Sequence, residues 1–423
     1  MHKNKIQKLK KQPNGKSLKK FEQLATEFKT AMAANNFPRA RQCCEGVLAI
    51  LPGNPSVLGD YALTLMRTHE YQRSYEIYRA MFAQKEKVHF AGNWIDGLAE
   101  VCGWLGKHDE LQYYGSYSLK AADQTYREGP VYPFPSVQPP AFDPLQKSKN
   151  IISFSLYGAS PRYCEALIKN AELSSEIYPD WTCRVYHDSS VPVEVLEQLR
   201  RLGVQLVDMS NEKTIPATLW RFLVIDDNQV TRYLVRDADS LFSEKEAAAV
   251  QQWLSSPYWF HHMRDYFTHT ELLLAGMWGG CNGIFPSVQK LIEAFVASYT
   301  GTARFTDQYF LRAALWPTVR NSILNHDEIF LFHHAKNYPP HSSVRWQHAN
   351  FHIGSNATYS AIAGELTIPD QSRSTALIEL ESDDFVRRYT VNIHDKKWQL
   401  SLPFFMIDQY KEGKLKVKFV TES

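Results

Sequence analysis

Two aspartates, Asp237 and Asp239, stand one residue apart directly after the apolar run at residues 233–235. Such a run is typical of a buried strand, and alternate side chains of an extended chain point to the same side, so both carboxylates can converge on one point. Two hard oxygen ligands suit Mg²⁺ or Mn²⁺, which keep several waters and take up phosphate oxygens from a substrate. A solvated Asp-x-Asp turn is the simpler alternative. The pattern therefore suggests a metal site, and this hypothesis needs support from the surrounding residues.

Two arginines could add contacts to a phosphate at this point. Arg236 precedes the first aspartate, and Arg221 lies just upstream of the strand. A guanidinium group matches phosphate oxygens in a bidentate geometry. The alternative for each is a surface ion pair. That alternative is favoured for Arg236, because alternation along the strand places it on the opposite face from Asp237.

A second polar run ends another apolar segment. Residues 258–263 predict a strand that delivers His262 and Asp265 near its end. Asp265 and Asp307 are candidates for a general base or for hydroxyl recognition, because deprotonating a hydroxyl needs a group within hydrogen-bond reach. Asp307 could instead cap the helix that it opens, since aspartate is common there. For the two adjacent histidines of this run, the simpler interpretation is that at least one packs in the core.

The elements that position these residues alternate between strands and helices. Strands are expected at 150–156, 182–186, 204–209 and 231–235, and helices at 161–177, 193–202, 219–225 and 244–254. Downstream, helices are expected at 288–299 and 307–315, and strands at 321–324, 375–379 and 415–420. This alternation favours a parallel α/β sheet, in which ligands bind at the carboxyl ends of the strands. The two aspartates sit at such an end.

The first part of the chain has a different period. Residues 21–126 predict helices, and residues 34–40 resemble residues 68–74 at an offset of 34, the period of tetratricopeptide helix pairs. A third unit is expected at 105–109. The stretch after these helices contains six prolines between residues 129 and 144, which predicts a linker. The helical region is expected either to bind a peptide or partner protein, or only to pack against the next domain.

Composition limits the functional classes. Residues 1–20 contain eight lysines and no acidic residue, so a formal net charge of +2 leaves about −6 on the remainder of the chain. The basic segment is expected to be disordered, and the folded body is not expected to bind nucleic acid specifically. No apolar run long enough to span a membrane is present. The six cysteines have no metal-ligand spacing, which favours a cytoplasmic protein, with peripheral contact at the inner membrane face as a variant.

Five short segments in one order resemble the nucleotide-sugar glycosyltransferases of the GT-A type, over about residues 150–356. They are the strand-end loop Ser153-Phe154-Ser155-Leu156-Tyr157-Gly158, Leu219-Trp220-Arg221-Phe222, the glycine-rich loop Ala275-Gly276-Met277-Trp278-Gly279-Gly280-Cys281-Asn282-Gly283, Thr306-Asp307-Gln308, and Phe351-His352-Ile353-Gly354, together with the Asp-x-Asp motif. The last segment departs from the family's His-x-x-Gly spacing. The resemblance implies an α/β fold with a GT-A mixed sheet, preceded by an all-α tetratricopeptide-like domain.

The resemblance also implies roles for individual residues. It implies a metal shell of Asp237, Asp239 and His352. It implies donor contacts from Tyr157, Arg221, Arg236, Asp237, Gly276, Trp278 and Gly279. The candidates for catalysis are Asp265, Asp307 and Gln308. The cofactor expected is Mn²⁺ or Mg²⁺, with a nucleotide-diphosphate sugar as donor and a UDP-sugar as the first expectation.

The predicted organisation is a basic tail at 1–20, a helical domain at 21–128, a proline-rich linker at 129–147, a catalytic domain at 148–366 and a C-terminal extension at 367–423 packed on it. The predicted function is metal-dependent transfer of a sugar to a glycan, lipid or protein acceptor, with either stereochemical outcome open. One alternative is a tetratricopeptide adaptor whose α/β domain has lost catalysis. Another is a metal-dependent phosphohydrolase or nucleotidyltransferase.

Overall fold

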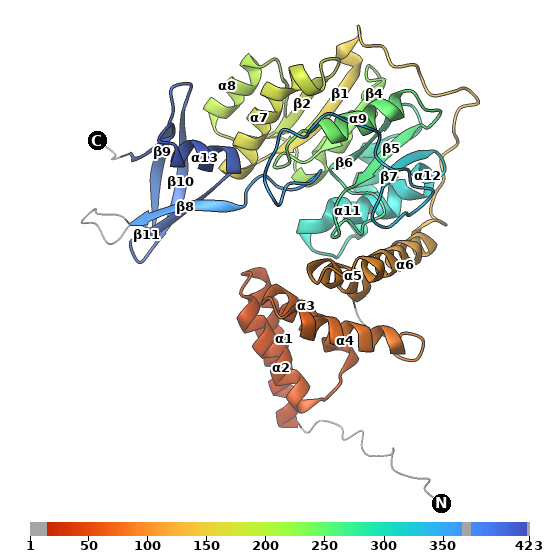
Figure 1. Ribbon diagram of the computed structural model, residues 1–423, viewed down its shortest axis with the longest axis vertical. Coiled ribbons are helices and arrows are strands. Elements are labelled where there is room, and N and C mark those ends of the chain that lie inside the picture. The colour runs from red at the N-terminus through yellow and green to blue at the C-terminus, as the bar shows by residue number, and fades with distance from the viewer. Residues whose placement is uncertain (1–14, 91, 366–373, 421–423) are drawn as a thin grey trace, which may run out of the picture. The chain divides into compact units, whose positions relative to one another are not determined.

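The computed structural model describes residues 15–90, 92–365 and 374–420, and the chain divides into two compact units, residues 1–120 and 121–423 (Figure 1). Most of the predicted basic tail lies outside the described residues. Its last six residues differ from the prediction, because the first helix begins at Gly15. No helix in the described ranges has the length and apolar character needed to cross a bilayer.

The first unit is built from pairs of antiparallel helices. The elements are α1 (Gly15–Ala33), α2 (Phe37–Ile50), α3 (Pro55–Arg67), α4 (Tyr71–Gln84), α5 (Trp94–Trp104) and α6 (His108–Tyr126), the last of which continues past residue 120. Within each pair the turn follows one plan. Asn35, His69 and Gly106 have φ angles of 53°, 64° and 68°, and the next residue donates its N–H to the carbonyl five residues back at 2.8–2.9 Å. This left-handed C-terminal turn explains the repeat seen in the sequence.

The second unit contains a seven-stranded mixed sheet with the order β3-β2-β1-β4-β6-β5-β7. Strand β6 runs antiparallel to both of its neighbours, whereas the other pairings are parallel. The strands are β1 (Asn150–Leu156), β2 (Thr182–His187), β3 (Gln205–Asp208), β4 (Arg232–Arg236), β5 (Phe260–Arg264), β6 (Met277–Cys281) and β7 (Ile323–Asp327). The predicted class, a helical region followed by a mixed α/β sheet, is confirmed.

Helices accompany this sheet between its strands. They are η1 (Lys147–Lys149), α7 (Pro161–Ile177), α8 (Val193–Arg201), η2 (Ala217–Asp226), α9 (Glu244–Leu254), α10 (Val288–Ser298), η3 (Ala303–Phe305), α11 (Thr306–Phe310), η4 (Leu311–Leu315) and α12 (Trp316–Val319). The strand order reverses between β1 and β4, because β2 and β3 extend to one side of β1 while β4 and the later strands lie on the other. Such a switch point is where open α/β sheets bind ligands.

Strand β6 corrects the prediction of a glycine-rich loop at 275–283, because residues 277–281 lie inside the sheet. A side chain at Gly279 would collide with the Tyr233 carbonyl and Leu234, and one at Gly280 would collide with Phe260. These glycines therefore let β4, β5 and β6 approach one another. Trp278 is fully buried in the same strand, so Trp278 and Gly279 form sheet core rather than the wall of a donor site.

A second, antiparallel sheet with the order β12-β9-β10-β11-β8 follows in the C-terminal part (blue in Figure 1). Its elements are β8 (Ser360–Glu365), β9 (Thr375–Glu381), β10 (Val386–His394), β11 (Lys397–Leu402), α13 (Phe404–Lys411) and β12 (Lys416–Phe419). Tyr389 of β10 donates a hydrogen bond to the buried carboxylate of Glu165 on α7. Phe404 packs with Leu241 in a shared apolar cluster. These contacts fix the C-terminal part of the chain to α7 and to the segment between β4 and α9.

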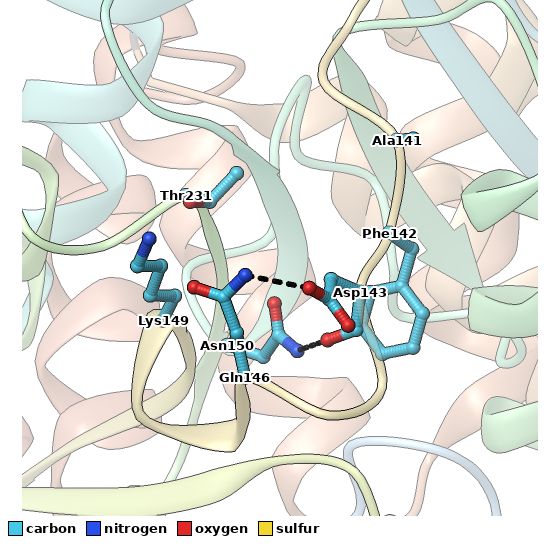
Figure 2. Close-up of a pocket in the computed structure, with 7 residues that line it drawn as sticks. All are labelled: Ala141, Phe142, Asp143, Gln146, Lys149, Asn150 and Thr231. Carbon is cyan, nitrogen blue, oxygen red and sulfur yellow. Dashed lines mark hydrogen bonds between the residues drawn. The ribbon is translucent and has the colours of Figure 1, made fainter.

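The proline-rich segment before β1 forms neither helix nor strand at residues 129–146, yet it is anchored to the second unit. The Tyr132 N–H donates to Thr318 Oγ1 at 3.0 Å, and Arg232 donates to the Pro140 carbonyl at 2.7 Å. A cavity of 460 Å³ lies where this segment meets the start of β1 and the residue before β4. Figure 2 shows the residues that line it, which are Ala141, Phe142, Asp143, Gln146, Lys149, Asn150 and Thr231. This cavity lies at the opposite edge of the sheet from Asp237 and Asp239.

Candidate functional site

The two aspartates of the Asp-x-Asp motif lie at the carboxyl end of β4, beside β1 at the switch point of the sheet. Every residue of β4 is buried, so the strand is fixed in the core and delivers the aspartates to its edge. The Asp237 side chain keeps 38% of its surface exposed, and that of Asp239 keeps 13%. The burial of Asp239, together with the charge of Asp237, raises the pKa of the Asp239 carboxyl. The motif therefore forms a compact acidic edge that remains accessible through Asp237.

A buried arginine joins Asp237 to Asp307. Arg221 of η2 is ion-paired with Asp237 through Nη1 and donates from Nη2 to Asp307 Oδ2 at 2.8 Å. Its side chain is only 6% exposed. The backbone around Arg221 is held on β1, because its N–H donates to Ser155 Oγ at 3.0 Å and its carbonyl accepts from Ser153 Oγ at 2.7 Å. The ion pair with Arg221 thus holds the Asp237 side chain in position, and the contact with Asp307 holds Arg221 in position.

The other aspartate has a different arginine. Arg162, in the first turn of α7, reaches Asp239 Oδ2 through Nε at 2.8 Å and through Nη2 at 2.6 Å. Arg221 likewise reaches Asp237 through Oδ1. One oxygen of each carboxylate therefore stays outside these ion pairs. Arg162 is a site residue that the sequence does not reveal, because nothing in the spacing connects it with a residue 77 positions away.

Gly276 and Gln308 support the same edge of the sheet. A Cβ atom at Gly276 would overlap the Asp237 carboxylate, so the absence of a side chain lets that carboxylate lie against the backbone. The amide nitrogen of Gln308 donates to the Leu273 carbonyl at 3.0 Å, and its amide oxygen accepts from the Ala275 N–H at 3.2 Å. Gln308 therefore positions the backbone that leads into Gly276.

The loop between β5 and β6, residues 265–276, is held by two side chains of β5. Arg264 is fully buried and donates to the carbonyls of His269, Glu271 and Leu272 at 3.2, 2.6 and 2.8 Å. His262 Nε2 accepts from the Leu274 N–H at 3.0 Å. Both residues are thus structural supports of the loop.

Asp265 has both carboxylate oxygens engaged. It is ion-paired with Lys245 through Oδ1, and Oδ2 accepts from the Ile353 N–H at 3.0 Å. Four residues on, the Ala357 N–H donates to the Asp239 carbonyl at 2.7 Å. Residues 353–357 therefore connect the end of β5 with the Asp-x-Asp turn. Asp307 is engaged in the same way, because its Oδ1 accepts from the Gln308 N–H at 2.9 Å while Oδ2 receives Arg221.

Two of the predicted site residues, Arg236 and His352, take other positions. Arg236 is buried and ion-paired with Glu246 at 3.2 Å, so it does not face the donor edge; alternation along β4 turns it to the other side. His352 stacks on Tyr266 with ring centroids 3.7 Å apart, and its Nδ1 lies 3.0 Å from the Asn350 carbonyl. Tyr157 follows β1 with 43% of its surface exposed and sets its ring edge-on to Trp220.

No group of three His, Cys, Asp or Glu side chains that could hold a metal ion occurs in the described ranges, so Asp237, Asp239 and His352 do not form one cluster. Mg²⁺ and Mn²⁺ do not require such a protein cage, because they are commonly bound by one or two carboxylates, waters and substrate phosphates. Asp237 and Asp239 each have one carboxylate oxygen outside the arginine pairs, and the Gly276 backbone lies against Asp237. These residues fit a site in which carboxylates, waters and substrate phosphates share the ion.

Comparisons with known proteins identify no family. No family model and no curated protein match the chain. Among solved structures it is similar to a Thermobaculum terrenum O-GlcNAc transferase mutant, with 13% identity over 53% of this chain and 51% of that one and a TM-score of 0.24; the chain thus spans about half of that protein. It is also similar to Mycobacterium tuberculosis glucosyl-3-phosphoglycerate synthase, in complex with Mn²⁺, UDP and phosphoglyceric acid (9% identity, 69% of this chain and 95% of that one, TM-score 0.27) and with Mg²⁺ and UDP (9%, 64% and 98%, TM-score 0.27). TM-scores this low carry no argument about function.

Proposed function

We propose that the second unit is a metal-dependent glycosyltransferase of the GT-A type, which transfers a sugar from a nucleotide-diphosphate sugar to a hydroxyl acceptor. The observation that carries the proposal is the position of Asp237 and Asp239 at the switch point, each with one carboxylate oxygen outside its arginine pair. Asp237 and Asp239 would hold a Mn²⁺ or Mg²⁺ ion there. When bound, such an ion offsets the charge that develops on a departing nucleoside diphosphate.

The other residues of the edge orient this pair. Arg221 fixes Asp237 against β4, and Asp307 and Gln308 act from one short helix on Arg221 and on the Gly276 backbone. Tyr157, which follows β1 and is 43% exposed, would contact the nucleoside. Asp307 is in this proposal a positioning residue, because both of its oxygens are already engaged. Asp265 stays a candidate base, provided that Lys245 releases its Oδ1 when an acceptor binds.

The experiment that tests the proposal is a panel of nucleotide sugars assayed for slow hydrolysis, with and without Mn²⁺. A transferase without its acceptor transfers sugar to water, so one donor of the panel should be hydrolysed only when the metal is present. Release of inorganic phosphate or pyrophosphate from nucleotides without sugar transfer would instead indicate a phosphohydrolase or nucleotidyltransferase.

An adaptor with an inactive α/β domain is the second candidate. Two observations favour it: the helix pairs of the first unit share one turn plan, and each aspartate of the motif already carries an arginine. In that case the arginines would replace the metal permanently. Neither metal nor nucleotide would bind, and the first unit would carry the function by binding a protein partner.

A further inference from the structure

Arg162 occupies an unusual place for a basic residue. It stands in the first turn of the 17-residue helix α7, which contains no acidic residue in that turn. The amino end of a helix favours negative charge, so a cation there is unfavourable unless another group offsets it. Here Asp239 offsets it, through two contacts to a single oxygen at 2.6 and 2.8 Å. The guanidinium group of Arg162 thus occupies the carboxylate that would bind the metal in the proposed function.

The two arginines of the site differ in how firmly they are held. Arg221 is buried and has two carboxylate partners and the Arg236 carbonyl, and the backbone around it is bonded to β1. Arg162 is 40% exposed, and Asp239 is the only carboxylate with which it forms an ion pair in the described structure. Arg162 can therefore leave its carboxylate at a much smaller cost than Arg221 can.

The charges of the site explain what such a movement would do. Three carboxylates, Asp237, Asp239 and Asp307, meet two guanidinium groups, which leaves one net negative charge. A divalent ion on the other oxygen of Asp239 places a second positive charge beside Arg162 and weakens the hold of Arg162 on this carboxylate. A nucleoside diphosphate that arrives with the ion supplies a new anionic partner, which a guanidinium binds well.

We propose that Arg162 is a positioning residue that holds Asp239 in the donor-free protein and transfers to the diphosphate of the donor when the metal takes Asp239. This inference rests on the proposed function. Its consequence is that metal and nucleotide bind as a coupled pair, each raising the affinity of the other by the same factor.

The test measures metal and nucleotide binding separately, in the full chain. Free Mn²⁺ is followed by electron paramagnetic resonance in the absence of nucleotide, and UDP binding is followed by calorimetry at saturating Mn²⁺, with GDP titrated in parallel. Arg162→Ala should bind Mn²⁺ alone about fivefold more tightly, because a competing cation is gone. The same variant should bind UDP about tenfold more weakly, because the diphosphate loses a charged donor.

Two further variants sharpen the result. Arg162→Lys keeps the charge and should keep part of the coupling, and it carries the test if the alanine variant does not fold. Arg201→Ala, which removes an arginine from helix α8 whose hydrogen-bond partner is Gln198, should leave both affinities unchanged.

Tighter binding of Mn²⁺ together with weaker binding of UDP in Arg162→Ala supports the proposal. If the wild-type chain binds Mn²⁺ and nucleotide but Arg162→Ala moves both affinities in one direction, or moves neither, the role of Arg162 is wrong while the proposed function stands. If the wild-type chain binds no nucleotide with Mn²⁺, the proposed function itself fails and the role of Arg162 fails with it.

Discussion

Asp307 accepts a hydrogen bond from Arg221 at 2.8 Å, and this contact makes it the anchor of the arginine that holds Asp237. The burial of Asp307 raises the pKa of its carboxyl, whereas the charge of Arg221 opposes that shift. Asp307, a candidate catalytic carboxylate in the sequence, is therefore joined to Asp237 through Arg221 in the folded protein.

Asp307→Asn tests this relationship. Asparagine can still accept from Arg221 but no longer neutralises it, so we expect a loss of about 1–3 kcal/mol in the free energy of unfolding. We also expect donor hydrolysis to fall about tenfold or more, because Asp237 loses its fixed position. Urea unfolding and steady-state kinetics measure the two effects. A variant with full donor hydrolysis would show that Asp307 does not position the site.

Alanine substitutions at Gly276 and Gly279 form a matched pair that distinguishes an effect on the candidate site from an effect on the stability of the sheet. Alanine at 276 would collide with the Asp237 carboxylate, whereas alanine at 279 would collide with the Tyr233 carbonyl inside the sheet. We predict that Gly276→Ala weakens nucleotide binding at least tenfold with a small change in stability, because the collision displaces the Asp237 carboxylate rather than the core.

Gly279→Ala should show the reverse pattern, with the free energy of unfolding lowered by about 2 kcal/mol or more through overpacking. Thermal unfolding and nucleotide titration on both variants check the pair. Equal losses of stability would contradict the assignment of Gly276 to the site.

Buried histidines predict how stability depends on pH. Burial lowers the pKa of His261 and His262 well below the usual value, and lowers that of His326 to about 4. The unfolded chain takes up protons at these residues below about pH 6.5 while the folded chain does not, so stability is present above that pH and is lost as the pH falls. Each histidine contributes up to about 1.4 kcal/mol per pH unit.

The measurement is urea unfolding between pH 7.5 and 5.5, for the wild-type chain and for His261→Leu. Both ring nitrogens of His261 lack a hydrogen-bond partner in the described structure, so leucine removes a titrating group without breaking a bond. The variant should show a shallower loss of stability. Comparing the two slopes removes the contribution of buried carboxylates such as Glu246, whose raised pKa acts in the opposite direction. Identical slopes would contradict the prediction.

The sequence predicts much of the sheet but not strand β6. The buried strands β1 and β4 appear as apolar runs, and α7 as an amphipathic helix, because burial imposes a period on the side chains. Strand β6 is different, since Gly279 and Gly280 stand where neighbouring strands leave no room for a side chain. A sequence shows the glycines but not the strands that require them, so the segment resembles a loop.

The candidate site is predictable in the same partial way. The placement of Asp237 and Asp239 at a strand end follows from the periodicity of residues close in the chain. The pairing of Asp239 with Arg162, and of Asp307 with Arg221, joins residues 77 and 86 positions apart, and local patterns carry no information on such distances. The surroundings of Asp307 depend on the second of these pairings.

The most direct test of the account is a thermal shift experiment with UDP, GDP and Mn²⁺ on the wild-type chain and on Asp237→Ala. A ligand that binds the folded chain raises its melting temperature, so one nucleotide should raise it only when Mn²⁺ is present, and the shift should vanish in the variant. A wild-type chain that shows no metal-dependent shift with any nucleoside diphosphate, or a variant that keeps the full shift, would contradict the assignment of these aspartates to a metal-bound sugar donor.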